Sequence, residues 1–252
     1  MELPHNKFKA AIKAGKAQIG IWSSLSSHIV AEVLAGAGFD WVLLDTEHSP
    51  NELPMVQAQL HAMAGGTATP IVRPAWNDMV LIKRYLDIGA QTLLLPYVQT
   101  VEEAQNAVRY TRYPPQGVRG VAGATRATGY GRIKDYFKRV HEELCVLVQV
   151  ETRLSLKNLD AIAAVEGVDG VFIGPNDLAA DLGHLGNWQH PDVWKAMEDA
   201  AKRIRKAGKA PGILVGEADG KRCLDAGFLF VAVGADVGML ARGSEALATK
   251  FK

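Results

Sequence analysis

Short apolar runs rich in valine, isoleucine and leucine recur along the chain between longer segments of helical periodicity. Such runs are typical of parallel strands that are buried on both faces. Eight of them are present, over residues 18–22, 41–45, 70–73, 92–96, 144–151, 170–174, 212–215 and 228–234. Helical patterns lie between them, for instance over residues 28–35, 53–63, 79–88, 101–110, 154–165, 193–206 and 239–250. The pattern predicts strands that alternate with helices.

Eight strand and helix alternations in a chain of 252 residues predict an α/β protein built as a closed (β/α)₈ barrel. The competing architecture is a doubly wound open sheet. That fold carries a glycine fingerprint after its first strand, whereas Trp22, Ser23 and Ser24 stand there in this chain. No linker or shift in composition divides the sequence, so we expect residues 1–252 to form a single domain.

Composition excludes several classes of protein. The chain is 48% hydrophobic with a formal net charge of +1, so it lacks the basic surface of a nucleic-acid binder. Cys145 and Cys223 are isolated, which argues against a disulfide framework or a zinc site. The sequence shows no signal peptide and no run of 18 apolar residues, so we expect a cytoplasmic protein without membrane or nucleic-acid partners.

The predicted strands end in polar residues. The active site of a (β/α)₈ barrel forms at the carboxyl ends of its strands. The residues at these ends are Asp45 to His48 on the second run, Arg73 on the third, Gln149 and Glu151 on the fifth, and Asn176 and Asp177 just after the sixth. Any of them alone is more often a helix cap or half of an ion pair. Their convergence on one rim favours a functional site, because so many buried polar groups are costly without a ligand.

Glu151 and Asp177 follow consecutive strands, which lie about 5 Å apart in a sheet. Two carboxylates without clustered histidine or cysteine suit a hard divalent cation such as Mg²⁺ or Mn²⁺. A 2-oxo acid chelates such an ion, which polarises the carbonyl and acidifies the adjacent carbon. Arg73 then stabilises the charge that develops on the keto oxygen. Gln149 lies two residues before Glu151 and so shares its strand face.

His48 is the candidate proton carrier, because a neutral imidazole accepts a proton near pH 7. Asp45 lies close enough in sequence to orient its ring, although a surface histidine is the simpler interpretation. The apolar runs contain no lysine, which disfavours a Schiff base presented from a strand. Trp22 and Leu214 are candidates for an apolar wall over a substrate methyl group, although strand-end apolar residues usually serve packing.

Five short motifs stand out along the chain, at residues 38–41, 45–50, 113–120, 148–152 and 167–178. Together they resemble the HpcH/HpaI aldolase family, and the likeness runs through essentially the whole chain. It is closest to the metal-dependent 4-hydroxy-2-oxoheptane-1,7-dioate (hydroxyketoacid) aldolases of aromatic-compound catabolism. The block from Glu151 to Asp177 is the most specific of these motifs.

The resemblance implies a pyruvate-dependent aldolase on a (β/α)₈ barrel of the phosphoenolpyruvate/pyruvate type, with a swapped terminal helix and a hexameric assembly. By that resemblance Glu151 and Asp177 bind the metal, which is Mg²⁺, Mn²⁺ or Co²⁺. Gln149 and the backbone at Asn176 hold pyruvate, and Arg73 stabilises the enolate. His48 is the base, Asp45 orients it, and Asp87 matches a family acid that raises its basicity.

The expected reaction is reversible cleavage of a 4-hydroxy-2-oxo acid into pyruvate and an aldehyde. An aldolase acting on 2-dehydro-3-deoxyglucarate is the nearest alternative, because its motifs overlap heavily. A citrate-lyase-like enzyme acting on a thioester is more distant. A non-catalytic protein that binds 2-oxo acids is a fourth possibility, which the Asp45 and His48 pair argues against, since binding alone requires no base.

Overall fold

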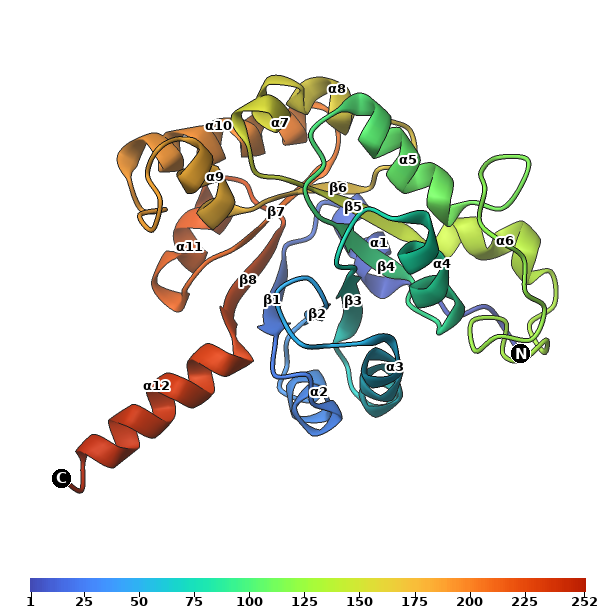
Figure 1. Cartoon of the computed structure of the whole chain (residues 1–252), viewed down its shortest axis with the longest axis horizontal. Helices are drawn as coiled ribbons and strands as arrows, with labels where there is room; N and C mark the ends of the chain where they lie inside the picture. The colour runs from blue at the N-terminus through green and yellow to red at the C-terminus, as the bar shows by residue number, and fades with distance from the viewer.

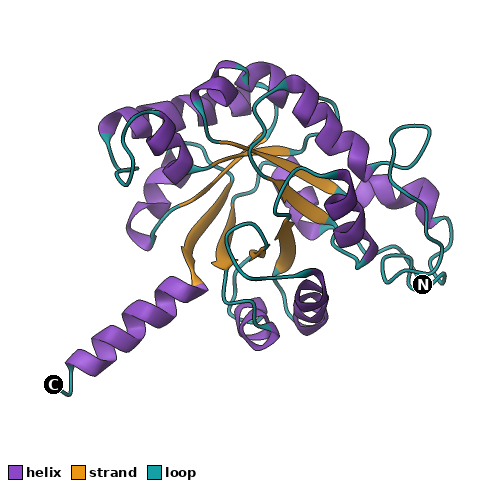
Figure 2. Cartoon of the chain, viewed as in Figure 1, coloured by secondary structure: helices purple, strands orange, loops and turns teal.

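The computed structural model describes all 252 residues and confirms the predicted barrel. Eight parallel strands close in sequence order, and helices surround them (Figures 1 and 2). The strands are β1 (Gln18–Ser23), β2 (Trp41–Asp45), β3 (Thr69–Arg73), β4 (Thr92–Leu95), β5 (Cys145–Val150), β6 (Gly170–Ile173), β7 (Ala210–Leu214) and β8 (Phe230–Ala235). Each observed strand overlaps its predicted run.

The helices also follow the predicted order, with several additions. They are α1 (Lys7–Lys13), α2 (His28–Ala35), α3 (Leu53–Ala62), the 3₁₀ turn η1 (Met63–Gly65), α4 (Met79–Asp87), α5 (Val101–Thr111), α6 (Tyr136–Glu143), α7 (Arg153–Lys157), α8 (Leu159–Ala163), α9 (Pro175–Asp181), α10 (Pro191–Lys206), α11 (Glu217–Asp225) and α12 (Asp236–Thr249). The segment predicted as one helix over 154–165 is the pair α7 and α8. Helices α1 and α9, with seven residues each, span too few turns to show a periodic pattern. None of the helices is long and apolar enough to span a membrane.

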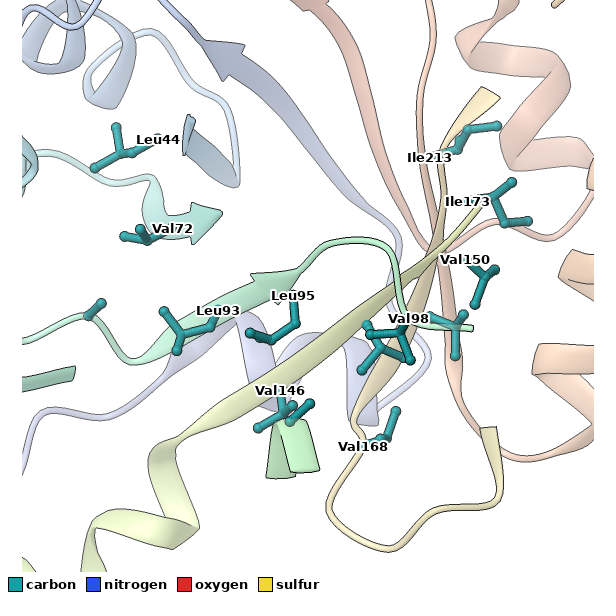
Figure 3. Close-up of a cluster of buried hydrophobic side chains, with 14 of the residues drawn as sticks. Leu44, Val72, Leu93, Leu95, Val98, Val146, Val150, Val168, Ile173 and Ile213 are labelled. Atoms are coloured by element: carbon teal, nitrogen blue, oxygen red, sulfur yellow. The ribbon is translucent and has the colours of Figure 1, made fainter. Parts of the chain in front are cut away.

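Most of the core lies between the outer face of the barrel and the surrounding helices. Strand residues such as Leu44, Val72 and Leu95 point into this layer, as do Val150 and Ile173 (Figure 3). All five are fully buried. Burial of apolar side chains on this face therefore fixes the strands and leaves the residues that follow them free to form a rim.

A smaller aromatic cluster fills the barrel and closes its amino-terminal end. Phe8 of α1 packs edge-to-face on Phe230, with 5.7 Å between ring centroids, and contacts Trp41 at 6.1 Å. Gly20 lies under the Trp41 ring, where a Cβ atom would overlap the indole. The interior is thus packed solid, and the open end of the barrel is the one formed by the strands' carboxyl ends.

Helix α12 projects away from the barrel rather than covering it (Figure 1). Asp236 at its start is its only buried residue and anchors it, because its carboxylate accepts hydrogen bonds from Ser23 Oγ at 2.9 Å and from the Ser24 amide at 2.8 Å. The rest of the helix exposes Val237, Met239 and other large apolar side chains.

Candidate functional site

The candidate site lies on the rim formed by the carboxyl ends of the strands. In the register between β2 and β3, Asp45 stands opposite Arg73. Gln149 is the penultimate residue of β5 and Glu151 follows the strand, beside β6, whose last residue pairs with Val150. The barrel therefore brings together the polar strand ends that the sequence indicated.

Arg73 is the centre of this arrangement. Its Nε and Nη2 atoms donate to the two carboxylate oxygens of Asp45, at 2.9 and 2.7 Å. Its Nη1 atom lies 2.8 Å from Oε2 of Glu47, a buried oxygen that forms no well-aligned hydrogen bond. The guanidinium also covers the Trp22 ring at 4.8 Å, and Trp22 Nε1 donates to Asp45. These contacts fix the cation with its side chain only 7% exposed.

The pKa values of the two carboxylates bound to Arg73, Asp45 and Glu47, shift in opposite directions. Burial alone would raise the pKa of Asp45, but the hydrogen bonds and charge of Arg73 bring that pKa below its ordinary value. Burial raises the pKa of Glu47 to about 7, opposed by Arg73 and reinforced by the negative charges of Asp45 and Asp177. Arg73 therefore neutralises Asp45 well and Glu47 only in part.

Glu151 is the second carboxylate with a raised pKa. It is 2% exposed, and its Oε2 accepts a hydrogen bond from Gln149 Nε2 at 2.6 Å. Its Oε1 accepts one from the Tyr97 amide at 3.1 Å. Burial raises the pKa of Glu151 to about 7 despite the Gln149 hydrogen bond, and the negative charges of Asp177 and Glu47 contribute. Three carboxylates therefore repel one another across this rim.

The carboxylate of Glu151 occupies space that only a glycine leaves free. A Cβ atom on Gly174, the residue after β6, would overlap Oε2 of Glu151 and crowd the amide nitrogen of Gln149. Gly174 also begins α9, which carries the exposed Asn176 and Asp177 in its first turn. The close approach at Gly174 explains how the β5 and β6 strand ends share one site.

His48 lies at the outer edge of the site. Its side chain is 66% exposed, and its Nε2 atom lies 3.8 Å from Oε1 of Glu47. Asp45 accepts a hydrogen bond from the backbone amide of His48 at 3.4 Å and is otherwise committed to Arg73, Trp22 and Glu47. The structure therefore does not place the Asp45 carboxylate against the imidazole, and Glu47 is the carboxylate that lies beside the ring.

Asp87 does not join the site within one chain. It ends α4, the helix that runs from the rim toward the start of β4, and it forms an ion pair with the buried Arg119 at 2.8 Å. The structure therefore does not bring Asp87 to His48. Leu214, by contrast, ends β7 half-buried against the interior aromatic cluster, and Trp22 belongs to that cluster.

Three contributors to the site were given no role from the sequence. Glu47 stands two residues after Asp45 and was named only as one of the polar residues that end the second run. Tyr97 binds Glu151 through its backbone, in a left-handed conformation with φ of 55° that no sequence pattern announces. Gly174 was given no role, because its close approach to Glu151 depends on the register of two strands.

The chemistry of the donors fits a hard divalent cation. Glu47, Glu151 and Asp177 offer carboxylate oxygens at one rim, with no histidine or cysteine ligand among them. Burial raises the pKa values of Glu47 and Glu151, the neighbouring carboxylates add to the shift, and Arg73 only partly opposes it. Oε1 of Gln149 is buried without a hydrogen-bond partner beside them. A cation at Glu151 and Asp177 would relieve this repulsion.

Comparison with known proteins agrees with this geometry. The chain is 59% identical over 249 residues to a 4-hydroxy-2-oxo-heptane-1,7-dioate aldolase of Klebsiella pneumoniae, covering 98% of this chain and 94% of the relative. A solved HpcH/HpaI aldolase/citrate lyase family protein from Burkholderia cenocepacia superposes with a TM-score of 0.95 at 40% identity, covering 98% and 99% of the two chains. An HpcH/HpaI aldolase from Desulfitobacterium hafniense gives a TM-score of 0.90 at 27% identity, covering 97% and 96%.

The family model described as HpcH/HpaI aldolase/citrate lyase matches residues 18–243, which include every strand of the barrel and all of the rim. The chain therefore belongs to the HpcH/HpaI aldolase/citrate lyase family.

Proposed function

We propose that the protein is a divalent-metal-dependent pyruvate aldolase that cleaves 4-hydroxy-2-oxo acids into pyruvate and an aldehyde. The observation that carries this proposal is the rim itself. The fixed guanidinium of Arg73 shares this rim with the carboxylates of Glu47, Glu151 and Asp177, and the pKa values of Glu47 and Glu151 are raised to about 7. Such a site accepts both a cation and the developing negative charge of an enolate.

The substrate class follows from the relatives. The Klebsiella pneumoniae relative carries the name of an aldolase for 4-hydroxy-2-oxo-heptane-1,7-dioate, and it matches nearly the full length of the chain. We take this dioate as the first substrate to test, in preference to sugar-acid substrates such as 2-dehydro-3-deoxyglucarate. A role in the breakdown of aromatic compounds would follow from that choice.

Glu151 and Asp177 are the residues that would hold the metal, which is Mg²⁺, Mn²⁺ or Co²⁺. When bound, the cation supplies Lewis-acid polarisation of the substrate's 2-oxo group. Gln149 and the Tyr97 amide hold the Glu151 carboxylate in place through hydrogen bonds to its two oxygens. The chain thus fixes this ligand before the substrate arrives, which reduces the reorganisation that binding requires.

Arg73 stabilises negative charge on the 2-oxo oxygen as the carbon–carbon bond breaks. A guanidinium has five N–H donors, and the hydrogen bonds to Asp45 engage two of them, while Nη1 makes a charge contact with Glu47. N–H groups therefore remain for substrate. Because Asp45 and the Trp22 ring fix the plane of the guanidinium, these donors are oriented in advance.

His48 removes the proton from the C4 hydroxyl during cleavage and returns it during aldol addition. Its exposed ring can reach a substrate at the mouth, and the Glu47 carboxylate 3.8 Å away stabilises the imidazolium that forms. We assign Trp22 and Leu214 to the apolar wall that faces the methyl carbon of pyruvate, and Asn176 to a backbone contact with its carboxylate.

We propose also that the protein is a homo-oligomer in which α12 packs on a second copy. The helix leaves its own barrel and exposes an apolar stripe, Val237, Leu240 and Leu247, that water would otherwise surround. Helix α2 exposes Ile29 and Val33, which offers an apolar surface of the same kind. A swapped helix builds a dimer, and the hexamer is the larger assembly that the family resemblance implies.

The test of the proposed chemistry separates two reactions. Cleavage of the dioate requires a base, whereas decarboxylation of oxaloacetate yields the same pyruvate enolate without one. We expect His48→Ala to reduce cleavage about 10²- to 10⁴-fold while sparing decarboxylation. Arg73→Ala should impair both, and His28→Ala, another exposed histidine, neither. Equal loss of both activities in folded His48→Ala would refute its assignment as the base.

The assembly has its own test. Sedimentation velocity of the double variant Leu240→Asp and Leu247→Asp should show a smaller species than the parent, because two charges would then lie in the proposed interface. Thr249→Asp, on another face of the same helix, should leave the sedimentation coefficient unchanged. A parent protein that sediments as a monomer would contradict the helix exchange.

A further inference from the structure

A second group of ligand-bearing side chains lies in the segment that joins α9 to α10 and in the first turn of α10 (Figure 1). It consists of His184, His190 and Asp192, whose ligand atoms all lie within 4.8 Å of one another. His184 Nε2 and His190 Nδ1 are each 3.6 Å from Oδ2 of Asp192. None of the three residues belongs to the rim or to the chemistry proposed for it.

The backbone around these residues is held firmly. The His184 amide donates to the carbonyl of Ala179 at 2.7 Å, and the His190 amide donates to that of Asn187 at 3.1 Å. The His190 carbonyl then accepts the Trp194 amide in the first turn of α10. Both imidazoles are therefore brought to one place by the fold and not by the flexibility of a loop.

The two rings lie face to face, with 3.6 Å between centroids and 14° between planes. His190 Nδ1 accepts the Asp192 amide at 3.2 Å, which shows that this nitrogen presents its lone pair toward Asp192. The side chains of His184 and His190 are 25% and 33% exposed, so a cation can approach the ring nitrogens from solvent.

We propose that His184, His190 and Asp192 form a binding site for a borderline divalent cation, of which Zn²⁺ is the best match. Two imidazole nitrogens and one carboxylate oxygen are ligands that Zn²⁺ prefers, and water completes a tetrahedral set. The same donors suit Mg²⁺ poorly, because that ion selects oxygen ligands. The rim and this cluster thus differ in the metal each selects.

A cation bound here ties the carboxyl end of α9 to the amino end of α10. Helix α9 carries Asn176 and Asp177 at its other end, so the site fastens the element that supplies one side of the rim. The expected consequence is greater thermal stability in Zn²⁺, since a ligand that binds only the folded chain stabilises it.

Isothermal titration calorimetry with ZnCl₂ at pH 7.5 tests the proposal in a variant that lacks the two proposed metal ligands of the rim. The double variant Glu151→Gln and Asp177→Asn should still bind one equivalent of Zn²⁺ and should show no binding to this cluster in MgCl₂. Adding His184→Ala and His190→Ala should abolish the equivalent. Adding His28→Ala and His61→Ala, which are exposed and outside the cluster, should leave it intact.

Circular dichroism establishes that each variant is folded. Should the histidine double variant fail to fold, His184→Gln and Asp192→Asn are tested singly. Each should weaken Zn²⁺ by more than the roughly 10- to 100-fold that loss of an outer partner of a metal site costs. No Zn²⁺ equivalent in the rim variant, or an equivalent that survives loss of both histidines, would overturn the proposal. Because every variant lacks the carboxylates of Glu151 and Asp177, the outcome does not depend on the proposed function.

Discussion

Replacing Glu151 by glutamine should stabilise the metal-free protein, although this residue is the proposed metal ligand. Burial raises the pKa of Glu151 from 4.5 to about 7, so at pH 8 the folded chain carries a buried carboxylate that it accommodates poorly. One pKa unit corresponds to 1.36 kcal/mol, which makes the ionised form destabilising by about 3 kcal/mol. Glutamine keeps the shape of the side chain and an oxygen that accepts the Gln149 hydrogen bond, and it has no charge.

The sign of the pH dependence follows from the raised pKa. Below pH 4.5 the carboxyl is protonated in both states and contributes nothing to stability. Between pH 4.5 and 7 the unfolded chain loses the proton and the folded chain retains it, so the free energy of unfolding falls as pH rises. The advantage of Glu151→Gln should therefore grow through this window and be constant above it.

Urea unfolding at pH 4.5, 6 and 8, in EDTA, measures this difference. Glu32→Gln, which removes an exposed carboxylate of α2 with no ion-pair partner, is the matched control and should show no such trend. Adding millimolar Mg²⁺ or Mn²⁺ at pH 8 should stabilise the parent and not Glu151→Gln. A difference between variant and parent that stays flat from pH 4.5 to 8 would refute the reasoning about burial.

Two further variants test other parts of the rim. Arg73→Lys keeps the charge and loses the planar fork that binds Asp45, so kcat for cleavage should fall by roughly 10²-fold or more, measured as pyruvate release; an unchanged kcat would return Arg73 to a structural role. Gly174→Ala places a methyl group against the Glu151 carboxylate and should weaken Mn²⁺ binding by roughly 10- to 100-fold in titration calorimetry. The control Gly65→Ala, at a position where a Cβ atom meets nothing, should leave the affinity unchanged. Equal Mn²⁺ affinities in the two variants would show that the close approach at Gly174 is unimportant.

The barrel was predictable because parallel strands buried on both faces must be written as continuous apolar runs. Each of the eight runs has a strand over it, and the polar rim follows because the residues at the strand ends face the open end of the barrel. Short helices were less accessible. Helix α9 has seven residues, and its first turn is defined by Pro175 after β6 rather than by any amphipathic pattern.

The site was predictable in its members and less so in their pairing. Their closeness in sequence suggested that Asp45 contacts His48, but the register of β2 and β3 places Asp45 opposite Arg73. The bidentate hydrogen bonds from Arg73 bind the carboxylate more strongly than an imidazole would. Asp87 is in the same situation, since its partner Arg119 lies 32 residues away. Pairs so distant in sequence are determined by how helices and loops pack, and the identity of a single residue does not indicate that packing.

The requirement for a divalent metal in aldol cleavage is the most direct test of the proposed function. The purified protein, freed of metal with EDTA, is given 4-hydroxy-2-oxo-heptane-1,7-dioate, and pyruvate is measured before and after addition of Mg²⁺, Mn²⁺ or Co²⁺. Parallel samples receive pyruvate and borohydride. The proposed mechanism predicts no cleavage without metal, recovery with it, and no covalent adduct. Cleavage in EDTA, or a lysine adduct trapped by borohydride, would contradict it.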